Sequence, residues 1–527
     1  MTNIALPKFI APMLQPEFYP HSVTEPIKLI QTHISFVLLT GEYVYKIKKS
    51  VDFGFLDYST LEKRQHFCQQ ELVMNQRGAP GIYLEVLPIL QDGDRFILGT
   101  RKDRNGEIIE YTLKMRQFSQ QDLWLHQFEQ GNLTVGDLEE FGRILAQFHQ
   151  NAVTNEYIRS FGKVDRIRMA IENNYRATQK YIGTLQDKTQ FEETKDYTDR
   201  FFQTYKPVFD RRIQTEKIRE CHGDLHLNNI ARWQGKIILF DCIEFNEPFR
   251  FVDVMYDVGF TVMDLEMRQR RDLANAFLNT YLEETGDWEG AQLLPLYRLR
   301  QAYVRAKVNS FLSDDRAISS AERDRAARTA SEYYRLAWEY TQPSRGQLIL
   351  MSGLSGSGKS TVARQLARRL GAVCIRSDAV RKHLAGIDLY QRGGDDLYTE
   401  AMNQRTYQRS IDLGETLATR GWSVILDAKF DRTRWREAAI AMARSHQLPL
   451  HILSCTAPLA VLRDRLNCRT GDITDATADL LASQQAAAEP FSPTEQNYVT
   501  TLDTTAALAP QLESIVRLTA RRSTRRM

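Results

Sequence analysis

The sequence predicts two parts, a mixed α+β part of two lobes over residues 1–340 and an α/β part with a mostly parallel sheet over 347–520. Three observations support this division. A glycine-rich loop at 353–360 stands between an apolar run and a helical pattern. A His-x-Asp-x-x-x-x-Asn pattern at 222–229 precedes a strand that ends in Asp. The polar, helix-breaking stretch 341–346 lies between them and is expected to be a linker.

The first lobe, about residues 1–120, opens with two predicted strands joined by a tight turn, 35–39 and 43–48. Alternate residues of a strand share a face, so Lys46 and Lys48 are expected on the same side of the sheet. A helix predicted over 60–76 offers Glu71 as an ion-pair partner. Lys46 is the preferred partner and Lys48 the alternative; an ordinary exposed strand lysine is the simplest competing interpretation.

The second lobe, about 121–340, contains the pattern from His222 to Asn229. In phosphotransferases with this spacing, the Asp accepts the proton of the attacking hydroxyl and the Asn binds Mg²⁺. We assign these roles to Asp224 and Asn229. Asp241, at the end of the strand 236–241, would be the second Mg²⁺ ligand, and Lys46 would bind the α/β-phosphates of ATP. The competing interpretation is a loop in which Asp224 and Asn229 make only turn hydrogen bonds.

On these motifs, residues 1–340 resemble the aminoglycoside phosphotransferase group of kinase-like enzymes. The resemblance implies a two-lobed protein-kinase-like fold and the hydroxyl of a small molecule as acceptor. It also implies that Asp257 braces the catalytic loop. One feature departs from the kinase pattern, because no Gly-x-Gly-x-x-Gly loop precedes the strands. Residues 32–35 stand near that place.

The acceptor of the first part is expected to be anionic or neutral, such as a sugar phosphate or a nucleotide. The helices of the second lobe are basic where such enzymes bind their acceptor; these residues are Arg298, Arg300, Arg305, Lys307 and Arg316. A solvated surface would carry the same residues. Glu244 follows the predicted metal site and is expected to bind a substrate hydroxyl or to act as a further metal ligand.

The loop that opens the second part is a complete phosphate-binding loop. It follows the apolar strand 348–351 and precedes a helix that ends at Gly371. Backbone N–H groups of such a loop bind phosphate oxygens, Lys359 reaches the β- and γ-phosphates, and the Ser360 hydroxyl binds Mg²⁺. The residues expected to bind the nucleotide are Gly353, Ser355, Gly356, Ser357, Gly358, Lys359, Ser360 and Thr361.

Polar residues follow two further predicted strands of the second part. Asp378 comes directly after the strand 372–377, and Asp427 ends the strand 423–427. Ligands of parallel sheets bind at these carboxyl ends. Asp378 is expected to accept the acceptor's proton, Asp427 to orient Mg²⁺, and Arg381 to bind the acceptor; the two carboxylates could also exchange roles.

Two arginines, Arg465 and Arg469, are predicted on one face of a helix that begins near Pro458. Guanidinium groups near a γ-phosphate stabilise the charge of the transition state. The segment 471–476 follows and is predicted to be a mobile lid. Surface arginines of an amphipathic helix are the alternative interpretation.

Residues 346–520 resemble the P-loop kinase group that contains polynucleotide 5′-hydroxyl kinases, zeta-type toxins, chloramphenicol phosphotransferase and gluconate kinases. The motifs that match are 375–382, 425–430, and the Arg465-x-x-x-Arg469 pattern before 474–476. The resemblance implies that Asp378 and Arg381 engage the acceptor.

The composition of the chain limits the binding partners and the cellular compartment that we expect. The net charge is +3 over 527 residues, so the chain lacks the overall charge of a polyanion-binding protein. The six cysteines form no C-x-x-C pair, which favours a reducing compartment and argues against a zinc site. No signal peptide or membrane span is recognised, and a cytoplasmic location without a membrane partner is expected. The basic residues 521–527 are expected to form a solvated tail.

The combined motifs predict a bifunctional, ATP- and Mg²⁺-dependent phosphotransferase with one active site in each part. One alternative is a P-loop kinase regulated by an N-terminal pseudokinase. Another is repair of nucleic-acid ends by phosphorylation of 5′-hydroxyls, which the near-neutral charge and the lack of an aromatic stacking platform disfavour. An ATP-driven switch without an acceptor would not need Asp378 and Arg381.

Overall fold

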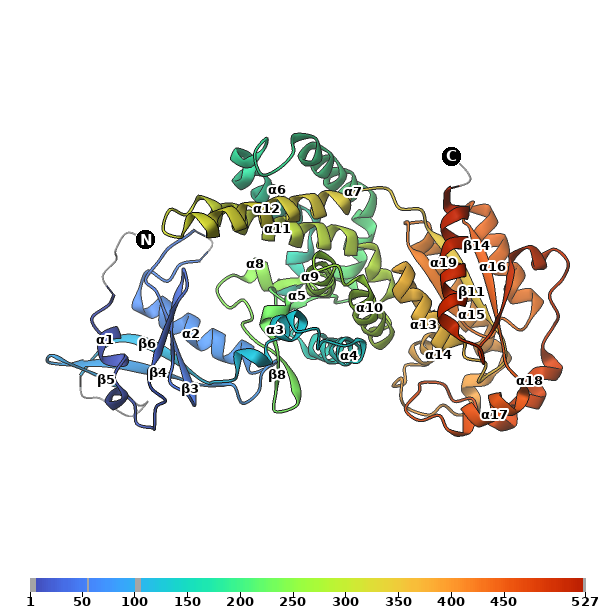
Figure 1. Ribbon diagram of the computed structural model, residues 1–527, viewed down its shortest axis with the longest axis horizontal. Coiled ribbons are helices and arrows are strands. Elements are labelled where there is room, and N and C mark those ends of the chain that lie inside the picture. Colours follow the sequence, from blue (N-terminus) through green and yellow to red (C-terminus); the bar gives the residue numbers. More distant parts are fainter. Residues whose placement is uncertain (1–5, 55, 100–105, 525–527) are drawn as a thin grey trace. The chain divides into compact units, whose positions relative to one another are not determined.

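The computed structural model describes residues 6–54, 56–99 and 106–524, which form two compact units (Figure 1). Unit 1 comprises Met1–Leu133, Gln147–Asp264 and Leu296–Tyr340; unit 2 comprises Thr134–Ala146, Leu265–Pro295 and Thr341–Met527. The last segment of unit 2 begins in the predicted linker. Its two earlier segments come from the predicted first domain, so the compact units do not follow the predicted limits 1–340 and 347–520 throughout.

The sheet of unit 1 is antiparallel and has the order β1-β2-β3-β6-β4-β5. Its strands are Lys28–Gln31, Ser35–Leu39, Tyr43–Lys48, Tyr83–Asp92 (β4), Arg95–Leu98 (β5) and Glu107–Arg116 (β6). Helix α2 (Leu61–Asn75) begins after the N-cap Thr60, whose hydroxyl accepts a hydrogen bond from the Lys63 N–H. Cys68 and Leu72 of α2 pack against Leu113 of β6. The helix thereby faces β3 and its lysines.

The remainder of unit 1 is mainly helical and contains two short antiparallel ribbons. One ribbon pairs β7 (Ile218–Glu220) with β10 (Phe251–Asp253), and the other pairs β8 (Ile230–Trp233) with β9 (Lys236–Leu239). The predicted catalytic loop joins β7 to β8, and Asp241 follows β9. The longer helices are α6 (Val164–Thr178), α7 (Lys188–Gln214), α9 (Val254–Met267), α11 (Leu294–Asp314) and α12 (Ser320–Glu339), with the ends of α9 and α11 in unit 2.

The sheet of unit 2 is parallel, in the order β12-β13-β11-β14-β15. The strands are Gln347–Ser352 (β11), Val373–Arg376 (β12), Ser423–Asp427 (β13), Leu450–Thr456 (β14) and Val499–Asp503 (β15). Parallel strands are covered on both faces and read as continuous apolar runs, and residues 348–351 are completely buried. The carboxyl ends of β11, β12 and β13 meet at one edge, where the phosphate loop, Asp378 and Asp427 lie.

Residues 265–295 belong to unit 2 because helix α10, which lies within them, is hydrogen-bonded to the chain at strand β12. Asn279 of α10 accepts a hydrogen bond from the Cys374 N–H of β12 (2.7 Å), and Asn275 donates to the Ala372 carbonyl (2.9 Å). Besides most of α4 (Val135–Asn151), the helices of the described part of unit 2 are α10 (Arg271–Thr285), α13 (Lys359–Leu370), α14 (Ser377–Ala385), α15 (Glu400–Ala418), α16 (Thr433–Ser445), α17 (Leu459–Asn467), α18 (Leu481–Ala487) and α19 (Leu508–Thr524).

Helix α19 extends into the segment expected to be a solvated tail. It ends at Thr524, so residues 521–524 have helical backbone, and 525–527 lie outside the described residues. Across the described part of the chain, no helix combines the length and the apolar character needed to cross a membrane.

A buried ion pair in unit 2 gives a test of its stability. Arg436 of α16 donates from Nε to Glu495 (2.7 Å), and both side chains are almost fully buried. Because Arg436→Ala leaves a buried carboxylate without its cation, we expect it to lower the free energy of unfolding of unit 2 by about 3–5 kcal/mol. Urea titration of the intact chain measures this loss.

Two further variants control this prediction. The exposed pair of Arg434 and Glu400 should contribute no more than about 1 kcal/mol, as is usual for surface ion pairs. The double variant Arg436→Met/Glu495→Leu removes both charges and should recover much of the lost stability. Equal losses for Arg434→Ala and Arg436→Ala would contradict the role of the buried pair.

Candidate functional site

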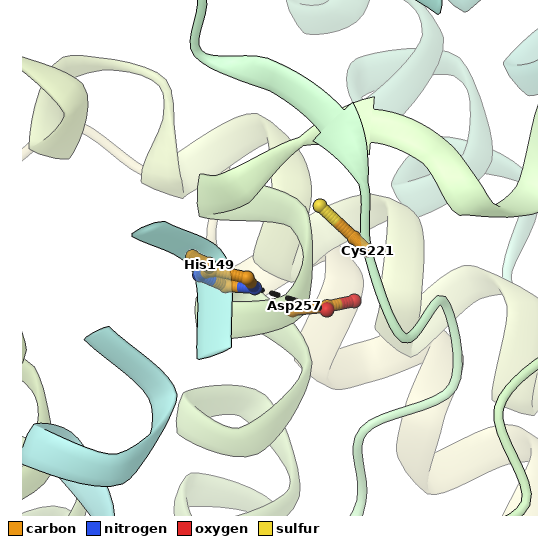
Figure 2. Close-up of side chains that lie close together, drawn as sticks. All are labelled: His149, Cys221 and Asp257. Carbon is orange, nitrogen blue, oxygen red and sulfur yellow. Dashed lines mark hydrogen bonds and ion pairs between the residues drawn. The ribbon is translucent and has the colours of Figure 1, made fainter. Parts of the chain in front are cut away.

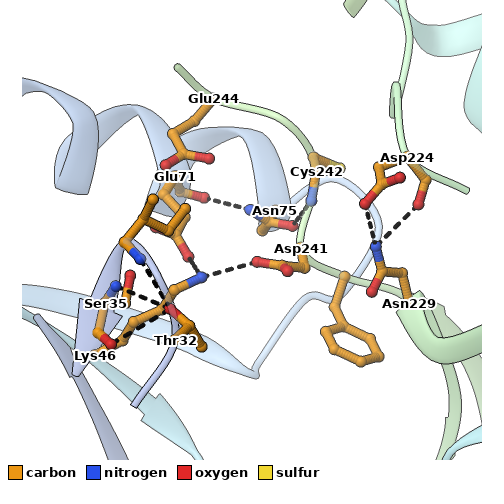
Figure 3. Close-up of polar contacts among 12 residues, drawn as sticks. Thr32, Ser35, Lys46, Glu71, Asn75, Asp224, Asn229, Asp241, Cys242 and Glu244 are labelled. Carbon is orange, nitrogen blue, oxygen red and sulfur yellow. Dashed lines mark hydrogen bonds and ion pairs between the residues drawn. The ribbon is translucent and has the colours of Figure 1, made fainter. Parts of the chain in front are cut away.

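The candidate site of unit 1 is organised around Glu71 of α2 (Figure 3). One carboxylate oxygen accepts from Lys46 Nζ at 2.7 Å and the other from Lys48 Nζ at 2.6 Å. Lys46 Nζ also lies 2.8 Å from an oxygen of Asp241. The two lysines share a face of β3, as the pleat predicts, and both bond to Glu71. Only Lys46 connects this carboxylate to the predicted metal ligand Asp241.

Electrostatics keep Lys46, Lys48 and Glu71 in their charged forms. Burial works to lower the pKa of Lys46, but Asp241 and Glu71 outweigh it and raise that pKa well above its usual value. Burial likewise works to raise the pKa of Glu71, whereas the two ammonium groups lower it to about 2. The ion pairs therefore persist across the physiological pH range.

Glu244, expected to bind substrate or metal, is occupied by protein groups instead. Its carboxylate accepts from Lys48 Nζ and from the Tyr58 hydroxyl, the latter at 2.5 Å, and its side chain is buried. These contacts hold Lys48 in place behind Lys46. The structure therefore favours a supporting role for Glu244 over the predicted contact with substrate.

The predicted base Asp224 lies in the loop between β7 and β8. Its Oδ2 accepts from Asn229 Nδ2 at 3.2 Å and lies 3.5 Å from His226 Nε2. The side chain is 38% exposed, which leaves it accessible to an acceptor. Burial within the loop works to raise the pKa of Asp224, but the neighbouring His226 outweighs it and the pKa is lowered. Asp224 is therefore ionised at neutral pH and can accept a proton.

Asp241 and Asn229 bring oxygen ligands to the same site (Figure 3). Asp241 has φ +63°, a left-handed conformation that few non-glycine residues adopt. Two bonds hold it there: its N–H donates to the Tyr83 hydroxyl (3.1 Å), and the next N–H, of Cys242, donates to Asn75 (2.8 Å). Asn229 uses its Nδ2 on Asp224, which leaves its carbonyl oxygen for a cation. Carboxylate and amide oxygens fit the ligand preference of Mg²⁺.

The three buried residues of Figure 2, His149, Cys221 and Asp257, lie close enough to hold a metal ion. Their contacts instead favour a brace. Asp257 accepts from the backbone N–H groups of His222 (2.7 Å) and Gly223 (2.9 Å) and bonds to His149 (3.2 Å). Burial raises the pKa of the Cys221 thiol well above its usual value, so it is a poor metal ligand. Asp257 holds the start of the catalytic loop, as the resemblance implies.

The candidate site of unit 2 is the loop between β11 and α13. Gly353, Gly356 and Gly358 have φ of +136°, +78° and +85°, which L-residues rarely adopt. A Cβ on Gly353 would lie 2.4 Å from the Cys455 carbonyl oxygen and one on Gly356 2.7 Å from that of Leu462. The tight turn therefore requires glycine at these positions.

Two buried polar groups of this loop fit a phosphate. Lys359 Nζ donates to the Leu354 carbonyl at 2.8 Å, and burial lowers the pKa of Lys359 although Asp427 opposes this. The Ser357 hydroxyl is buried without a hydrogen-bond partner among the described residues. A bound phosphate would supply the missing negative charge and acceptor atoms.

The other predicted loop residues occupy less enclosed positions. Ser360 is the second residue of α13, and Thr361, the third, is exposed. The Ser355 N–H donates to Gln484 of α18 at 3.1 Å, so a nucleotide would have to displace this side chain before it could use that N–H.

The sequence placed Asp378 directly after a strand that ends at residue 377; β12 ends at Arg376 instead, and Asp378 lies in the first turn of α14. Arg381, on the next turn, is buried; it donates to the Leu397 carbonyl (2.7 Å) and lies over the Tyr398 ring (5.0 Å). Its Nε has no hydrogen-bond partner within the described residues. Asp427 is buried at the end of β13. These side chains come from adjacent strand ends, as the sheet predicts.

Sequence reasoning missed Arg376, which connects several parts of unit 2. This arginine at the end of β12 is only 3% exposed and lies 3.7 Å from Asp427, 3.2 Å from Glu283 of α10 and 2.6 Å from Asp472. Burial opposes its charge, but these carboxylates raise its pKa. The sequence did contain an indication of this role, because Arg376 is a charged residue at the end of an otherwise apolar strand.

The placement of Arg465 and Arg469 on one helical face is wrong. Helix α17 ends at Asn467, so Arg469 lies beyond it. Arg465 donates to the side chain and the carbonyl of Thr504, both at 2.9 Å, and lies beside the phosphate loop. Arg469 lines a separate cavity of about 270 Å³ between α10, α13 and residues 469–473.

The predicted lid residues are held at two points in this conformation. Asp472 pairs with Arg376. Asp475 accepts from the Gly393 N–H (3.0 Å) and the Tyr398 hydroxyl (2.7 Å), and lies 3.4 Å from Lys382. These contacts connect the predicted lid to residues 393–398, which include Leu397 and Tyr398, the two residues that contact Arg381.

Two regions of the chain match known protein families. Residues 113–294 match the family model described as "Phosphotransferase enzyme family", and residues 348–491 match the one described as "AAA domain". "Uncharacterized protein Rv2004c" of Mycobacterium tuberculosis is 30% identical over 472 residues, which are 88% of this chain and 91% of the mycobacterial one. The chain belongs to the same family as this protein. It joins a protein-kinase-like phosphotransferase region to a P-loop kinase region and is a kinase.

Two further similarities are partial. A shikimate kinase of Geobacter sulfurreducens is 32% identical over 132 residues, 24% of this chain and 66% of that enzyme. A choline kinase structure from Cryptosporidium parvum covers 63% of this chain and 94% of its own, with 11% identity and a TM-score of 0.38.

The pKa of Asp224 leads to a pH prediction. His226 lowers this pKa, so His226→Gln should raise it. A base acts only when ionised, and the acid limb of Asp224-dependent phosphate transfer should therefore move to higher pH, with little change on the alkaline side. The pH profile of transfer from γ-labelled ATP, in a chain that also carries Lys359→Ala, measures the shift. An unmoved acid limb would contradict the proposed influence of His226.

Proposed function

We propose that the chain is a bifunctional, ATP- and Mg²⁺-dependent kinase that moves the γ-phosphate of ATP to hydroxyl groups of small molecules, with one active site in each unit. The observation that carries this proposal is the presence of two separate sets of groups. Each set has a lysine for phosphate, a carboxylate for the acceptor proton, and oxygen ligands for a metal.

In unit 1, Glu71 orients Lys46 to bind the α/β-phosphates. Asn229 and His226 both contact Oδ2 of Asp224, which leaves Oδ1 to take the acceptor's proton. Asn229 and Asp241 would hold Mg²⁺. When bound, the ion would supply positive charge that offsets the negative charge developing on the phosphates. Asp257 keeps the loop that carries Asp224 fixed during transfer.

In unit 2, the loop N–H groups and Lys359 bind the phosphates, and Ser360 with Asp427 would hold Mg²⁺. Asp378 takes the proton of the second acceptor, whose polar group Arg381 binds through its free Nε. Arg465 holds the loop beside Thr504, and Arg469 reaches the γ-phosphate only if residues 469–473 move from their cavity. Asp378 and Asp427 could exchange these roles.

The alternative is a P-loop kinase, acting on a small molecule or a 5′-hydroxyl polynucleotide, with a regulatory N-terminal pseudokinase. It is supported by the turn at residues 32–35, which replaces a glycine-rich loop. This turn is closed by its own bonds, with the Thr32 N–H donating to the Ser35 carbonyl (2.9 Å) and the Ser35 N–H to the Thr32 hydroxyl (2.9 Å). The intact bond between Lys46 and Glu71 favours an active site instead.

Two variants separate the sites. Asp224→Ala removes the base of unit 1 and Lys359→Ala the phosphate-binding lysine of unit 2, so each should reduce one set of products at least about 100-fold and leave the other unchanged. The intact chain and both variants are incubated with γ-labelled ATP, Mg²⁺ and a metabolite extract, and in parallel with 5′-hydroxyl oligonucleotides.

The exposed Lys206 provides a control, and Lys206→Ala should retain both product sets. Labelling that depends only on Lys359 would establish the regulatory alternative. Labelled oligonucleotide would identify a nucleic-acid acceptor.

A further inference from the structure

Helix α11 carries a buried guanidinium near the predicted base of unit 1. Arg300 is 5% exposed, and its guanidinium carbon lies 4.6 Å from the centre of the Tyr256 ring. Tyr256 precedes Asp257, whose carboxylate accepts from the N–H groups of His222 and Gly223 next to Asp224, so Arg300 lies against the helix that holds the catalytic loop. Within the described residues, Arg300 makes no hydrogen bond or ion pair, and its Nε is buried without a partner.

Two further cations of α11 lie in the same region. Lys307 donates to the neutral amide oxygen of Asn174 (2.6 Å); burial and then the nearby charge of Arg300 lower its pKa. Burial opposes the charge of Arg305, but its interactions with Tyr333, Asp224 and Asp264 outweigh burial and raise its pKa. Neither Lys307 nor Arg305 has an ion-pair partner within the described residues. Three cations of one helix therefore lie in this region, and none of them forms an ion pair among the described residues.

A buried, unpaired guanidinium is energetically unfavourable unless something compensates it. The cation–π contact with Tyr256 supplies only part of that compensation. The ring attracts the positive charge, but it offers no acceptor oxygen to the five N–H donors of the guanidinium. A phosphate or carboxylate group would supply both the charge and the acceptor oxygens, in the two-pronged geometry that arginine favours. The described protein atoms do not supply this charge or these acceptor oxygens to Arg300.

We infer that the acceptor of the unit 1 site is a small alcohol that also carries an anionic group, a phosphate or a carboxylate, which binds Arg300 and Lys307 while its hydroxyl faces Asp224. The inference rests on the proposed function of this site, and it excludes the neutral acceptor that the sequence left open. In the reaction, the hydroxyl proton passes to Asp224 and the hydroxyl oxygen bonds to the γ-phosphorus. The bond from this phosphorus to the bridging oxygen breaks, and ADP keeps the electron pair.

The charge of the acceptor can be tested without knowing its identity. A metabolite extract is separated on an anion exchanger before the assay, and each fraction is incubated with γ-labelled ATP, Mg²⁺ and the Lys359→Ala chain. Acceptor activity that depends on Asp224 should appear in the retained fraction. Activity in the flow-through would overturn the inference. Prior treatment of the retained fraction with alkaline phosphatase distinguishes the sources, because a phosphate-bearing acceptor loses activity and a carboxylate-bearing one keeps it.

Arg300 itself is tested by substitution. Arg300→Gln should raise the KM for the retained acceptor at least about tenfold and change kcat less, since the contact is made by substrate and transition state alike. Arg328, an exposed arginine of α12 with no role in the proposed site, is the matched control, and Arg328→Gln should leave KM unchanged. Equal KM values for the Arg300→Gln and parent chains would contradict the inference.

A stability measurement separates binding from packing and does not need turnover. Arg300→Met removes an uncompensated buried charge, so it should raise the melting temperature of the chain without ligand and abolish any further increase caused by the retained fraction. A lower melting temperature, with the ligand-induced increase intact, would show that Arg300 only packs against Tyr256 and would overturn the inference.

The same measurement distinguishes this inference from the proposed function. If no fraction is labelled in an Asp224-dependent way, the proposed reaction of unit 1 fails. Thermal stabilisation of the Asp224→Asn chain by the retained fraction, lost with Arg300→Met, would still establish an anion site. If that stabilisation is also missing, both ideas fail.

Discussion

The Glu71 carboxylate lies between two lysines, and the arrangement of the unit 1 site depends on this contact. A single buried charge would be costly, but two ammonium groups compensate it and in turn reach Asp241 and Glu244. Strand β3, helix α2 and the segment after β9 are thereby joined through side chains. The lysine that would bind phosphate is fixed in direction before any ligand arrives, which lowers the cost of ordering it on binding.

Unit 2 also has a buried charge that is shared by several groups of opposite charge, but here the central group is a cation. Arg376 is a buried cation shared by carboxylates from β13, α10 and the lid segment. It contacts both the predicted metal ligand Asp427 and Asp472 of the predicted lid, so one buried cation connects the end of β13 to residues 471–476. Helix α10 therefore contributes to the P-loop unit although it lies far from the phosphate loop in the sequence.

The site predictions differ in how far local sequence supports them. The phosphate loop, the strands 35–39 and 43–48 and the capped helix after Thr60 depend on neighbouring residues, and the structure has them where the patterns place them. The common helical face expected for Arg465 and Arg469 is wrong, whereas the substrate or metal contact expected of Glu244 stays a prediction. Glu244 is occupied by Lys48 and Tyr58, which are far away in sequence, whereas α17 ends two residues before Arg469.

The sequence alone determined which residue types could act and in which order along the chain. Glycines at positive φ, alternation along β3 and the spacing from Asp224 to Asn229 are local constraints, and local constraints can be read from a sequence. Tertiary structure decided which charges are paired. Lys48 and Glu244 pair across the fold, and Arg376 contacts three carboxylates from other elements. Arg300 is buried, and its Nε has no hydrogen-bond partner among the described residues. Pairing depends on which side chains meet after folding, and no pattern within one strand or helix contains that information.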